Sequence, residues 1–199
     1  MTTLNENDVE QNLIDLLTAQ GYEYFYGPHI APSSSNPQRE SFASVVLENH
    51  LKESLKRLNP EIPESARHEA YQQIIHLGSS DLMANNEKFH RFLTDGITVE
   101  YFKDGSTKGV NVKLIDLDNI ANNSFWVVNQ FIIKENHADK QLDAVIFVNG
   151  LPLVVAELKN PVNEKATLDT AFTQIQNYKK AVPSIFYYNS LCVISDGIE

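Results

Sequence analysis

The chain has 199 residues, enough for one domain with a sizeable core, and its 42% hydrophobic and 21% charged residues are typical of a folded protein. It contains no apolar run of about eighteen residues or more, and its first residues lack the basic start and apolar stretch of a secretory signal, so we expect neither a membrane-spanning helix nor a secretory leader. The formal net charge of −10 excludes a broad basic surface. Any binding of DNA would therefore need basic residues gathered at one site, or another domain or subunit.

The one cysteine, Cys192, lies in the apolar run of residues 191–194 and has no partner for a disulfide within the chain. A buried, unreactive thiol fits this position, and a reducing compartment fits a chain without disulfides. We therefore expect a cytoplasmic protein with no membrane among its partners.

Four helices are predicted in the first half of the chain from the spacing of apolar residues. Gly21 ends the first of them, and Asp95-Gly96 closes the fourth. Their predicted ranges are 6–19, 42–58, 63–77 and 81–93. Between the first two, residues 22–26 are predicted as a short extended piece, and residues 28–37, with three prolines and three consecutive serines, as a loop.

Strands dominate after residue 96. Lys103-Asp104-Gly105-Ser106 and Asn149-Gly150 are hairpin signals between alternating or β-branched runs. The predicted strands are 97–102, 110–115, 125–133, 141–148, 151–159 and 187–195, and a helix is predicted over residues 164–180. This order of elements predicts an α/β fold in which helices pack on a mixed sheet.

The candidate chemistry begins at Glu157-Leu158-Lys159, which closes the otherwise apolar strand 151–159. Because side chains alternate across a strand, Glu157 and Lys159 are predicted to project to one side and Leu158 to the other. An acid and a base at the end of a buried strand indicate a functional site. The alternative is that the strand simply emerges into solvent at this point.

Asp143 adds a second carboxylate near the start of the preceding strand, among apolar neighbours where an unpaired charge is costly. The hairpin register decides whether it meets Glu157. A strict two-residue turn at Asn149-Gly150 sets Asp143 opposite Ala156. A three-residue bulged loop that also includes Leu151 sets it opposite Glu157. The hypothesis of one shared site therefore requires a bulged register.

Two carboxylates this close either raise one pKa or bind a divalent cation, and Mg²⁺ prefers carboxylate oxygens with retained water. Such a cation lowers the pKa of bound water and offsets charge on a phosphodiester oxygen, while Lys159 would stabilise the transition state or orient the water. Zinc is not indicated, because the six histidines are scattered. The sequence has neither a Gly-x-Ser-x-Gly elbow nor a phosphate-binding loop.

Asp143 together with Glu157-Leu158-Lys159 resembles the PD-(D/E)xK nuclease superfamily, although Asp and Glu-x-Lys alone are a common pattern. The flanking segments are more specific. FWVVNQF (residues 125–131) and LDAVIFVNGLPLVVAELKNP (residues 142–161) resemble the N-terminal endonuclease domain of the R, or HsdR, subunit of type I restriction enzymes, and the resemblance covers nearly the whole chain. Many relatives carry Arg-Pro where this chain has Gln141-Leu142, which we do not expect to disable the site.

The resemblance implies a restriction-endonuclease-like fold, with a mixed central sheet in an αβββαβ core, flanking helices and an N-terminal helical insertion. Residues 1–199 would form one endonuclease domain of a longer subunit, with the insertion at about 42–94 and the catalytic core at about 97–199 plus the helix 6–19. Asp143 and Glu157 would bind Mg²⁺ with the backbone carbonyl of Leu158, and Lys159 would be the catalytic lysine.

Two further features gain a role from the resemblance. Gln174 and Tyr178 share one helix face and match a Gln-x-x-x-Tyr motif that supports the site or contacts DNA, although Tyr178 also fits an ordinary core position. Superfamily members often place a glutamate of the first helix against the metal. Glu10 leans toward the packed face of that helix and is our candidate, with Glu6 as a rival and a solvent-exposed glutamate as the alternative.

The implied activity is Mg²⁺-dependent hydrolysis of double-stranded DNA by a type I site-specific deoxyribonuclease, after ATP-driven translocation. No Walker A sequence occurs in these residues, so we expect the motor, and with it ATP binding, outside this chain. Methyltransferase and specificity subunits are the implied partners. They would supply DNA recognition, which would reconcile the function with the acidic charge.

Two other interpretations stay open. The chain could be a docking module that keeps the nuclease fold without catalysis, which the acidic charge and the missing Arg-Pro favour. Metal binding by the wild type compared with Asp143→Ala distinguishes this case. The chain could also be a freestanding repair or junction nuclease, which would have to bind DNA by itself.

Overall fold

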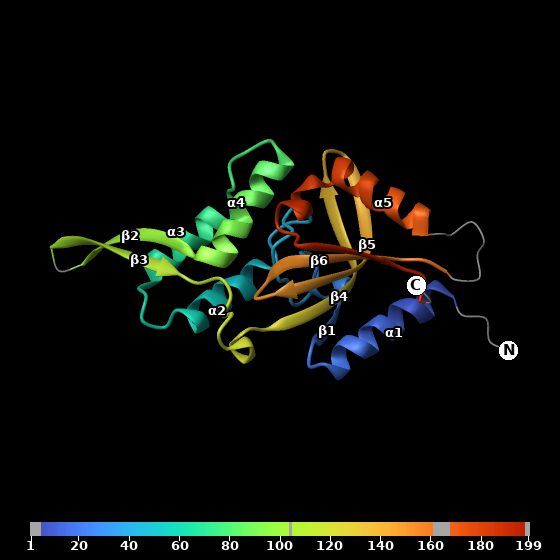
Figure 1. Cartoon of the computed structure of the whole chain (residues 1–199), viewed down its shortest axis with the longest axis horizontal. Helices are drawn as coiled ribbons and strands as arrows, with labels where there is room; N and C mark the ends of the chain where they lie inside the picture. Colours follow the sequence, from blue (N-terminus) through green and yellow to red (C-terminus); the bar gives the residue numbers. More distant parts are fainter. Residues whose placement is uncertain (1–4, 104, 161–167, 198–199) are drawn as a thin grey trace.

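The computed structural model describes residues 5–103, 105–160 and 168–197, and its centre is a five-stranded mixed sheet (Figure 1). β4, β5 and β6 form an antiparallel meander, β1 runs parallel to β4, and β7 runs parallel to β6. The strand order is β1 (Glu23–Tyr26), β4 (Phe125–Glu135), β5 (Ala138–Val148), β6 (Leu151–Leu158) and β7 (Leu191–Ser195). A mixed sheet flanked by helices is consistent with the restriction-endonuclease-like fold and confirms the predicted fold class.

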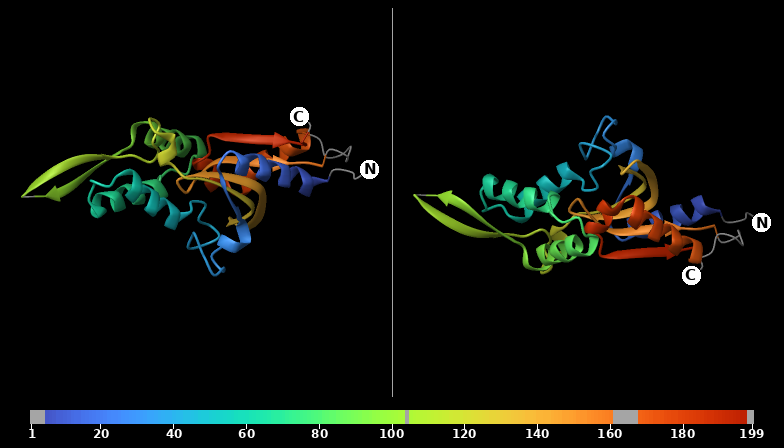
Figure 2. Two further views of the ribbon diagram at one scale, coloured as in Figure 1. Left: turned by 90° about the horizontal axis from the view of Figure 1, so that it is seen from below. Right: turned by 90° about the horizontal axis from the view of Figure 1, so that it is seen from above.

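Helices α1 (Glu6–Ala19) and α5 (Leu168–Ala181) lie on opposite sides of the sheet (Figures 1 and 2). Asn5 begins α1 with a capping box, because its side chain accepts from the Asp8 N–H while the Asp8 carboxylate accepts from the Asn5 N–H. α1 contacts β1, β4 and β6, and α5 contacts β6 and β7. Both helices therefore pack against the strand that carries Glu157.

A helical block follows β1 in the chain. It contains α2 (Glu48–Leu58), α3 (Glu64–Ile75) and α4 (Leu82–Asp95), and the hairpin of β2 (Ile97–Lys103) and β3 (Ser106–Val112) comes next. The hairpin forms its own two-stranded sheet, contacts α3 and projects at the end opposite the termini (Figure 1). The predicted boundaries place this hairpin in the catalytic core, whereas in the structure it does not join the central sheet. The division into insertion and core stays a prediction.

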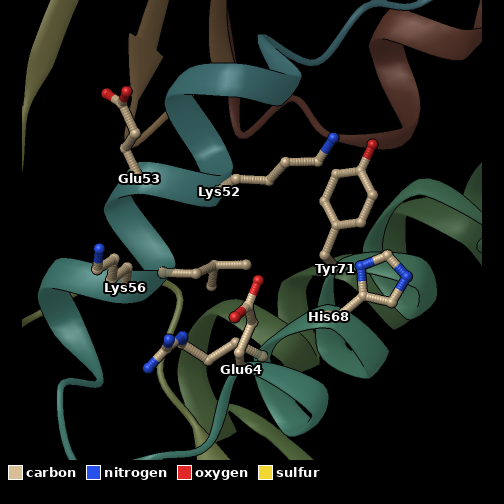
Figure 3. A pocket seen from close by; sticks show the side chains of 8 residues that line it. Lys52, Glu53, Lys56, Glu64, His68 and Tyr71 are labelled. Atoms are coloured by element: carbon tan, nitrogen blue, oxygen red, sulfur yellow. The ribbon is translucent and has the colours of Figure 1, made fainter.

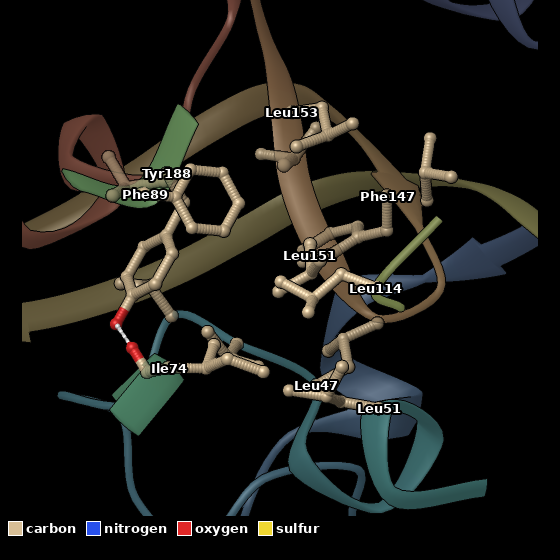
Figure 4. Close-up of a cluster of buried hydrophobic side chains, with 14 of the residues drawn as sticks. Leu47, Leu51, Ile74, Phe89, Leu114, Phe147, Leu151, Leu153 and Tyr188 are labelled. Carbon is tan, nitrogen blue, oxygen red and sulfur yellow. Dashed lines mark hydrogen bonds between the residues drawn. The ribbon is translucent and has the colours of Figure 1, made fainter. Parts of the chain in front are cut away.

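One hydrophobic core joins the helical block to the sheet. Leu47 and Leu51, at the start of α2, lie beside Phe147 and Leu151 of the β5–β6 hairpin, and all four side chains are almost fully buried (Figure 4). Burial of one such side chain contributes about 1.5–3 kcal/mol. The helical block is therefore anchored on the hairpin that carries Asp143 and Glu157.

The predicted start of the second helix is wrong, since α2 begins at Glu48 rather than at Phe42. The backbone of this segment bonds to the sheet instead. The Phe42 carbonyl accepts from the Lys134 N–H at 3.0 Å, and the Leu47 N–H donates to the Gly150 carbonyl at 2.9 Å. These two backbone groups bond to strands or their turn and are therefore not available for the hydrogen bonds of a helix.

Other boundaries also differ from prediction. β3 ends at Val112 rather than at Ile115, because the Lys113 N–H donates to the Asn59 side chain instead of a strand. β7 begins only at Leu191, because Pro183–Tyr187 forms a 3-10 helix, η3. Two more 3-10 helices are η1 (Gly27–Ile30) and η2 (Ile120–Asn122). The predicted helix start at residues 164–167 lies outside the described residues. In the described part of the chain, no helix is long and apolar enough to cross a membrane.

Candidate active site

The β5–β6 hairpin sets the geometry of the candidate site. Asn149 and Gly150 form its two-residue turn with φ values of 53° and 86°, a backbone that an Asn-Gly pair adopts readily. The predicted three-residue loop is therefore wrong. The register shifts by one residue further along, between the pairs Phe147↔Pro152 and Ile146↔Val154, so that Leu153 is the bulged residue. Pro152 has no N–H to donate, which is why the ladder breaks beside it.

The shifted register has the effect that the sequence hypothesis required. Ala144 pairs with Ala156, so the next position sets Asp143 across from Glu157. Asp143 Oδ2 accepts a 2.7 Å hydrogen bond from the backbone N–H of Leu158. Burial raises the pKa of Asp143, the Leu158 N–H and Lys159 lower it, and the negative charges of Glu6 and Glu10 raise it.

Glu157 is fully buried, and its Oε1 forms an ion pair with Lys159 Nζ, whose side chain is 11% exposed. The two side chains lie on the same side of the strand, as the alternation predicts. The other oxygen, Glu157 Oε2, is buried and forms no hydrogen bond in the described part of the chain, although the Tyr178 hydroxyl lies near enough to lower the pKa of Glu157. Burial first, and the Asp143 charge second, raise the pKa of Glu157 to about 7.

Helix α5 completes one side of the site. Gln174 Oε1 accepts a 3.0 Å hydrogen bond from Lys159 Nζ, and Gln174 Nε2 donates to the Tyr178 hydroxyl at 2.6 Å. The Tyr178 hydroxyl in turn donates to the Gln141 carbonyl at 3.4 Å. Tyr178 is buried as the core alternative predicts, yet it also belongs to this hydrogen-bonded chain. The structure thus brings Asp143, Glu157, Lys159, Gln174 and Tyr178 together.

Helix α1 supplies the other side. Glu10 is partly buried and accepts hydrogen bonds from Asn129 and Gln130 of β4, whereas Glu6 is exposed. Asn129 and Gln130 were not predicted from the sequence as site residues. The signal was present, because two consecutive amides interrupt the otherwise apolar run FWVVNQF.

The oxygen atoms present fit Mg²⁺. Asp143 and the unsatisfied Oε2 of Glu157 are hard ligands, and Mg²⁺ usually binds through one or two carboxylates while it retains several waters. Within the described residues, no three His, Cys, Asp or Glu side chains are gathered closely enough to hold an ion by themselves. Two carboxylates with water are therefore the arrangement that this site supports. The predicted contribution of the Leu158 carbonyl stays a prediction.

A groove of about 440 Å³ opens beside the site between β5 and α5. Its lining residues include Lys140, Thr173, Asn177, Gln174 and Tyr178, together with Asp139, which forms an ion pair with Lys134. The described residues form no ion pair with Lys140. This groove therefore borders Gln174, which accepts a hydrogen bond from Lys159.

A second pocket, of about 300 Å³, lies between α2 and α3 and contains none of the predicted site residues (Figure 3). Two of its cationic side chains already have partners, and acidic residues line the same walls. Lys52 Nζ lies 4.5 Å from the centroid of the Tyr71 ring, Arg67 donates to the Asn59 carbonyl at 3.2 Å, and Glu53 and Glu64 line the same walls. It lacks the concentrated charge of an anion site.

Comparison with known proteins gives matches over almost the whole chain. The chain is 40% identical over 196 residues to the type I restriction enzyme HindI endonuclease subunit of Haemophilus influenzae, covering 98% of this chain and 19% of that relative. It is 32% identical over 200 residues to the putative MjaIXP endonuclease subunit of Methanocaldococcus jannaschii, covering 98% and 19%. It is also 32% identical over 200 residues to the EcoprrI endonuclease subunit of Escherichia coli, covering 98% and 57%.

The chain thus spans about a fifth of the length of the first two of these relatives. A family model described as the type I restriction enzyme R protein N terminus matches residues 3–199. These matches agree with the mixed sheet and the Asp143–Glu157–Lys159 geometry, and they show that this chain belongs to the family of type I restriction enzyme R protein N termini.

Proposed function

We propose that the chain is the Mg²⁺-dependent endonuclease domain of a type I restriction enzyme R subunit and hydrolyses phosphodiester bonds of double-stranded DNA. One observation carries the proposal. Glu157 Oε2 is buried without a hydrogen-bond partner among the described residues, across the hairpin from Asp143 and beside Lys159. A buried carboxylate oxygen of this kind is costly unless a cation meets it.

Asp143, Glu157 and the Leu158 carbonyl would hold the ion. When bound, Mg²⁺ lowers the pKa of a coordinated water and offsets the charge that builds on the phosphodiester. Lys159 has three N–H donors, of which Glu157 and Gln174 occupy two. The third is available to a phosphate oxygen or to the attacking water, so Gln174 and Glu157 orient Lys159 for the substrate.

The groove between β5 and α5 is the proposed approach for the DNA backbone. Lys140 supplies a cation there, and Thr173 and Asn177 supply neutral polar groups. These side chains would contact phosphates next to the scissile one, because Gln174, the partner of Lys159, lines the same groove. Such contacts position the backbone without selecting a sequence.

Sequence recognition and translocation are assigned to other parts of the enzyme. The chain spans 19% of the HindI relative, and we propose that an ATP-driven motor lies in the remainder of the subunit, with methyltransferase and specificity subunits as partners. A net charge of −10 opposes independent binding to DNA. Delivery of DNA by the larger assembly removes this difficulty.

The test is a nicking assay on the full-length subunit in its complex, with ATP hydrolysis followed in the same samples. Lys159→Ala should abolish cleavage while ATP hydrolysis continues. Lys180→Ala, an exposed lysine at the end of α5, is the matched control and should leave both activities intact. Loss of both activities in Lys159→Ala would contradict a catalytic role and point to folding or assembly.

A docking module without catalysis makes a different prediction for metal binding. Calorimetry with Mg²⁺ or Mn²⁺ should show binding to the wild type and its loss in Asp143→Ala. Equal binding to both proteins would show that the proposed site is wrong.

A further inference from the structure

Both carboxylate oxygens of Glu10 are hydrogen-bonded to consecutive side chains of β4. Asn129 Nδ2 donates to Oε1 at 2.8 Å, and Gln130 Nε2 donates to Oε2 at 2.6 Å. Neighbouring residues of a regular strand point to opposite faces of the sheet, so one carboxylate could not contact both. A local departure from strand geometry must bring the two amides together.

Gln130 provides that departure. Its φ is 53°, in the left-handed region that residues other than glycine rarely adopt. No residue is inserted, since Asn129 pairs with Ala144 and Phe131 pairs with Leu142 on either side, which sets Gln130 across from Asp143. This backbone costs about 1–2 kcal/mol. The strand therefore holds a costly conformation directly beside the candidate site.

Second contacts fix the orientation of both amides. The Asn129 Oδ1 accepts a 3.1 Å hydrogen bond from the Tyr24 hydroxyl, and the Gln130 Oε1 accepts one from Gln141 Nε2. Because each amide oxygen is occupied by a donor, each NH₂ group is left to face Glu10. A flip of either amide would turn its oxygen toward the Glu10 carboxylate and lose that hydrogen bond.

We propose that Asn129 and Gln130 are positioning residues that hold the Glu10 carboxylate toward the Asp143–Glu157 pair, where it faces the water shell of the bound Mg²⁺. The inference rests on the proposed function. Each Glu10 oxygen keeps acceptor capacity after one amide hydrogen bond. The network also distinguishes Glu10 from Glu6, which is exposed on the same helix.

Electrostatics agree with this placement. The negative charges of Glu6 and, to a smaller extent, Glu10 raise the pKa of Asp143, so both carboxylates of α1 lie within electrostatic range of the site, and it is the two hydrogen bonds to β4 that single out Glu10. Contact through water also agrees with the absence, within the described residues, of three acidic, His or Cys side chains close enough to share an ion. Partners of this outer kind typically change metal affinity by about 10–100-fold when they are mutated.

The experiment measures Mn²⁺ affinity by calorimetry and stability by urea unfolding in the wild type, Gln130→Gly, Glu10→Gln and the double variant. Glycine adopts the left-handed backbone without strain, and the relief of about 1–2 kcal/mol offsets the loss of the two hydrogen bonds of Gln130, so Gln130→Gly should be about as stable as the wild type. Its Mn²⁺ affinity should nevertheless fall by roughly 10-fold. Glu10→Gln should fall similarly, and the double variant should be no weaker than Glu10→Gln, because Gln130 acts through Glu10.

Two variants control for backbone effects. Asn136→Gly relieves the same kind of strain, at φ 49° in the exposed β4–β5 turn, and should leave Mn²⁺ affinity unchanged. Gln130→Asn tolerates the left-handed backbone but is one methylene shorter, and it should lose affinity as Gln130→Gly does.

The inference is overturned if Gln130→Gly keeps wild-type Mn²⁺ affinity, or if it weakens binding further in the Glu10→Gln background. A purely structural network would instead lower stability in both single variants and leave affinity unchanged. Asp143→Ala separates this failure from a failure of the proposed function. If Asp143→Ala alone loses Mn²⁺, only the inference fails; if Asp143→Ala binds like the wild type, the function fails with it.

Discussion

Asp143 Oδ2 accepts a 2.7 Å hydrogen bond from the backbone N–H of Leu158, so one carboxylate both ties the end of β6 to β5 and faces the buried Glu157. Substitution can separate these two roles. Asparagine keeps an acceptor oxygen for the Leu158 N–H and removes the charge, whereas alanine removes both.

Asp143→Asn should therefore be at least as stable as the wild type in the absence of metal, and Asp143→Ala should lose about 1–3 kcal/mol. Both should lose Mg²⁺-dependent cleavage. Urea unfolding measures the first difference, and the nicking assay of the full complex measures the second. Equal stability of the two variants would mean that the bond to Leu158 contributes nothing.

The protonation of Glu157 should make stability depend on pH. Burial and Asp143 raise its pKa to about 7 from an ordinary value of 4.5. Between these two values the unfolded chain has released the proton that the folded protein still holds, so stability falls as pH rises through this window. Below this window Glu157 is protonated in both the folded and the unfolded protein. Above it Glu157 is ionised in both, and the full loss of stability persists.

Glu157→Gln removes this titration. Relative to the wild type, the variant should gain on the order of 3 kcal/mol between about pH 4 and about pH 8 in metal-free buffer. The difference in unfolding free energy between Glu157→Gln and the wild type is measured at both pH values. Its change with pH is independent of any constant effect of the amide. A difference that stays constant with pH would contradict the raised pKa. Added Mg²⁺ should shrink the gain, because the cation favours the ionised carboxylate.

The sequence was sufficient to predict the central elements because their signals are local. Alternation within one strand predicts that Glu157 and Lys159 share a side, and helical spacing predicts that Gln174 and Tyr178 share a face. Both predictions agree with the hydrogen bonds of the structure. For the β5–β6 hairpin, only two alternative registers could be predicted. A bulge at Leu153 changes the register without any change in the turn.

Long-range pairing could not be predicted, because it depends on contacts between segments that lie far apart in the sequence. The start of α2 depends on where the backbone of residues 42–47 finds hydrogen-bond partners, and these lie in β4 and in the β5–β6 turn. The contacts of Glu10 with Asn129 and Gln130 depend on one left-handed residue within a strand. Nothing in the local propensity of glutamine indicates that conformation.

Tyr178→Phe should weaken the support of Lys159 while it preserves the packing of the ring. The hydroxyl accepts from Gln174 Nε2 at 2.6 Å and donates to the Gln141 carbonyl at 3.4 Å. Its loss should cost about 1 kcal/mol of stability. Single-turnover cleavage by the assembled enzyme should slow while DNA binding is unchanged, because Gln174 is no longer fixed against Lys159.

Tyr26→Phe is the matched control, since Tyr26 is exposed and lies in β1 at the opposite edge of the sheet. It should leave both stability and the cleavage rate unchanged. An equal slowing in both variants, or weaker DNA binding in Tyr178→Phe alone, would argue against a role for the hydroxyl in orienting Lys159.

Gly150→Ala tests the contact between the helical block and the hairpin. Gly150 has φ +86°, and a Cβ there would lie 2.7 Å from the Leu51 nitrogen and 2.8 Å from the Leu47 carbonyl oxygen. Both are backbone atoms at the start of α2, so the strain cannot be relieved by a side-chain rotation. The variant should lose about 2–5 kcal/mol, from the left-handed backbone and from overpacking together.

Gly105→Ala isolates the backbone part of that loss. Gly105 has φ +77° in the β2–β3 turn, and a Cβ there would meet no atom within 4 Å, so it should lose only about 1–2 kcal/mol. Equal losses in the two variants would mean that α2 is not pressed against the turn. If Gly150→Ala is the less stable of the two yet still binds Mn²⁺ when folded, the register that sets Asp143 across from Glu157 is fixed by the bulge at Leu153 and not by the packing of α2 on the turn.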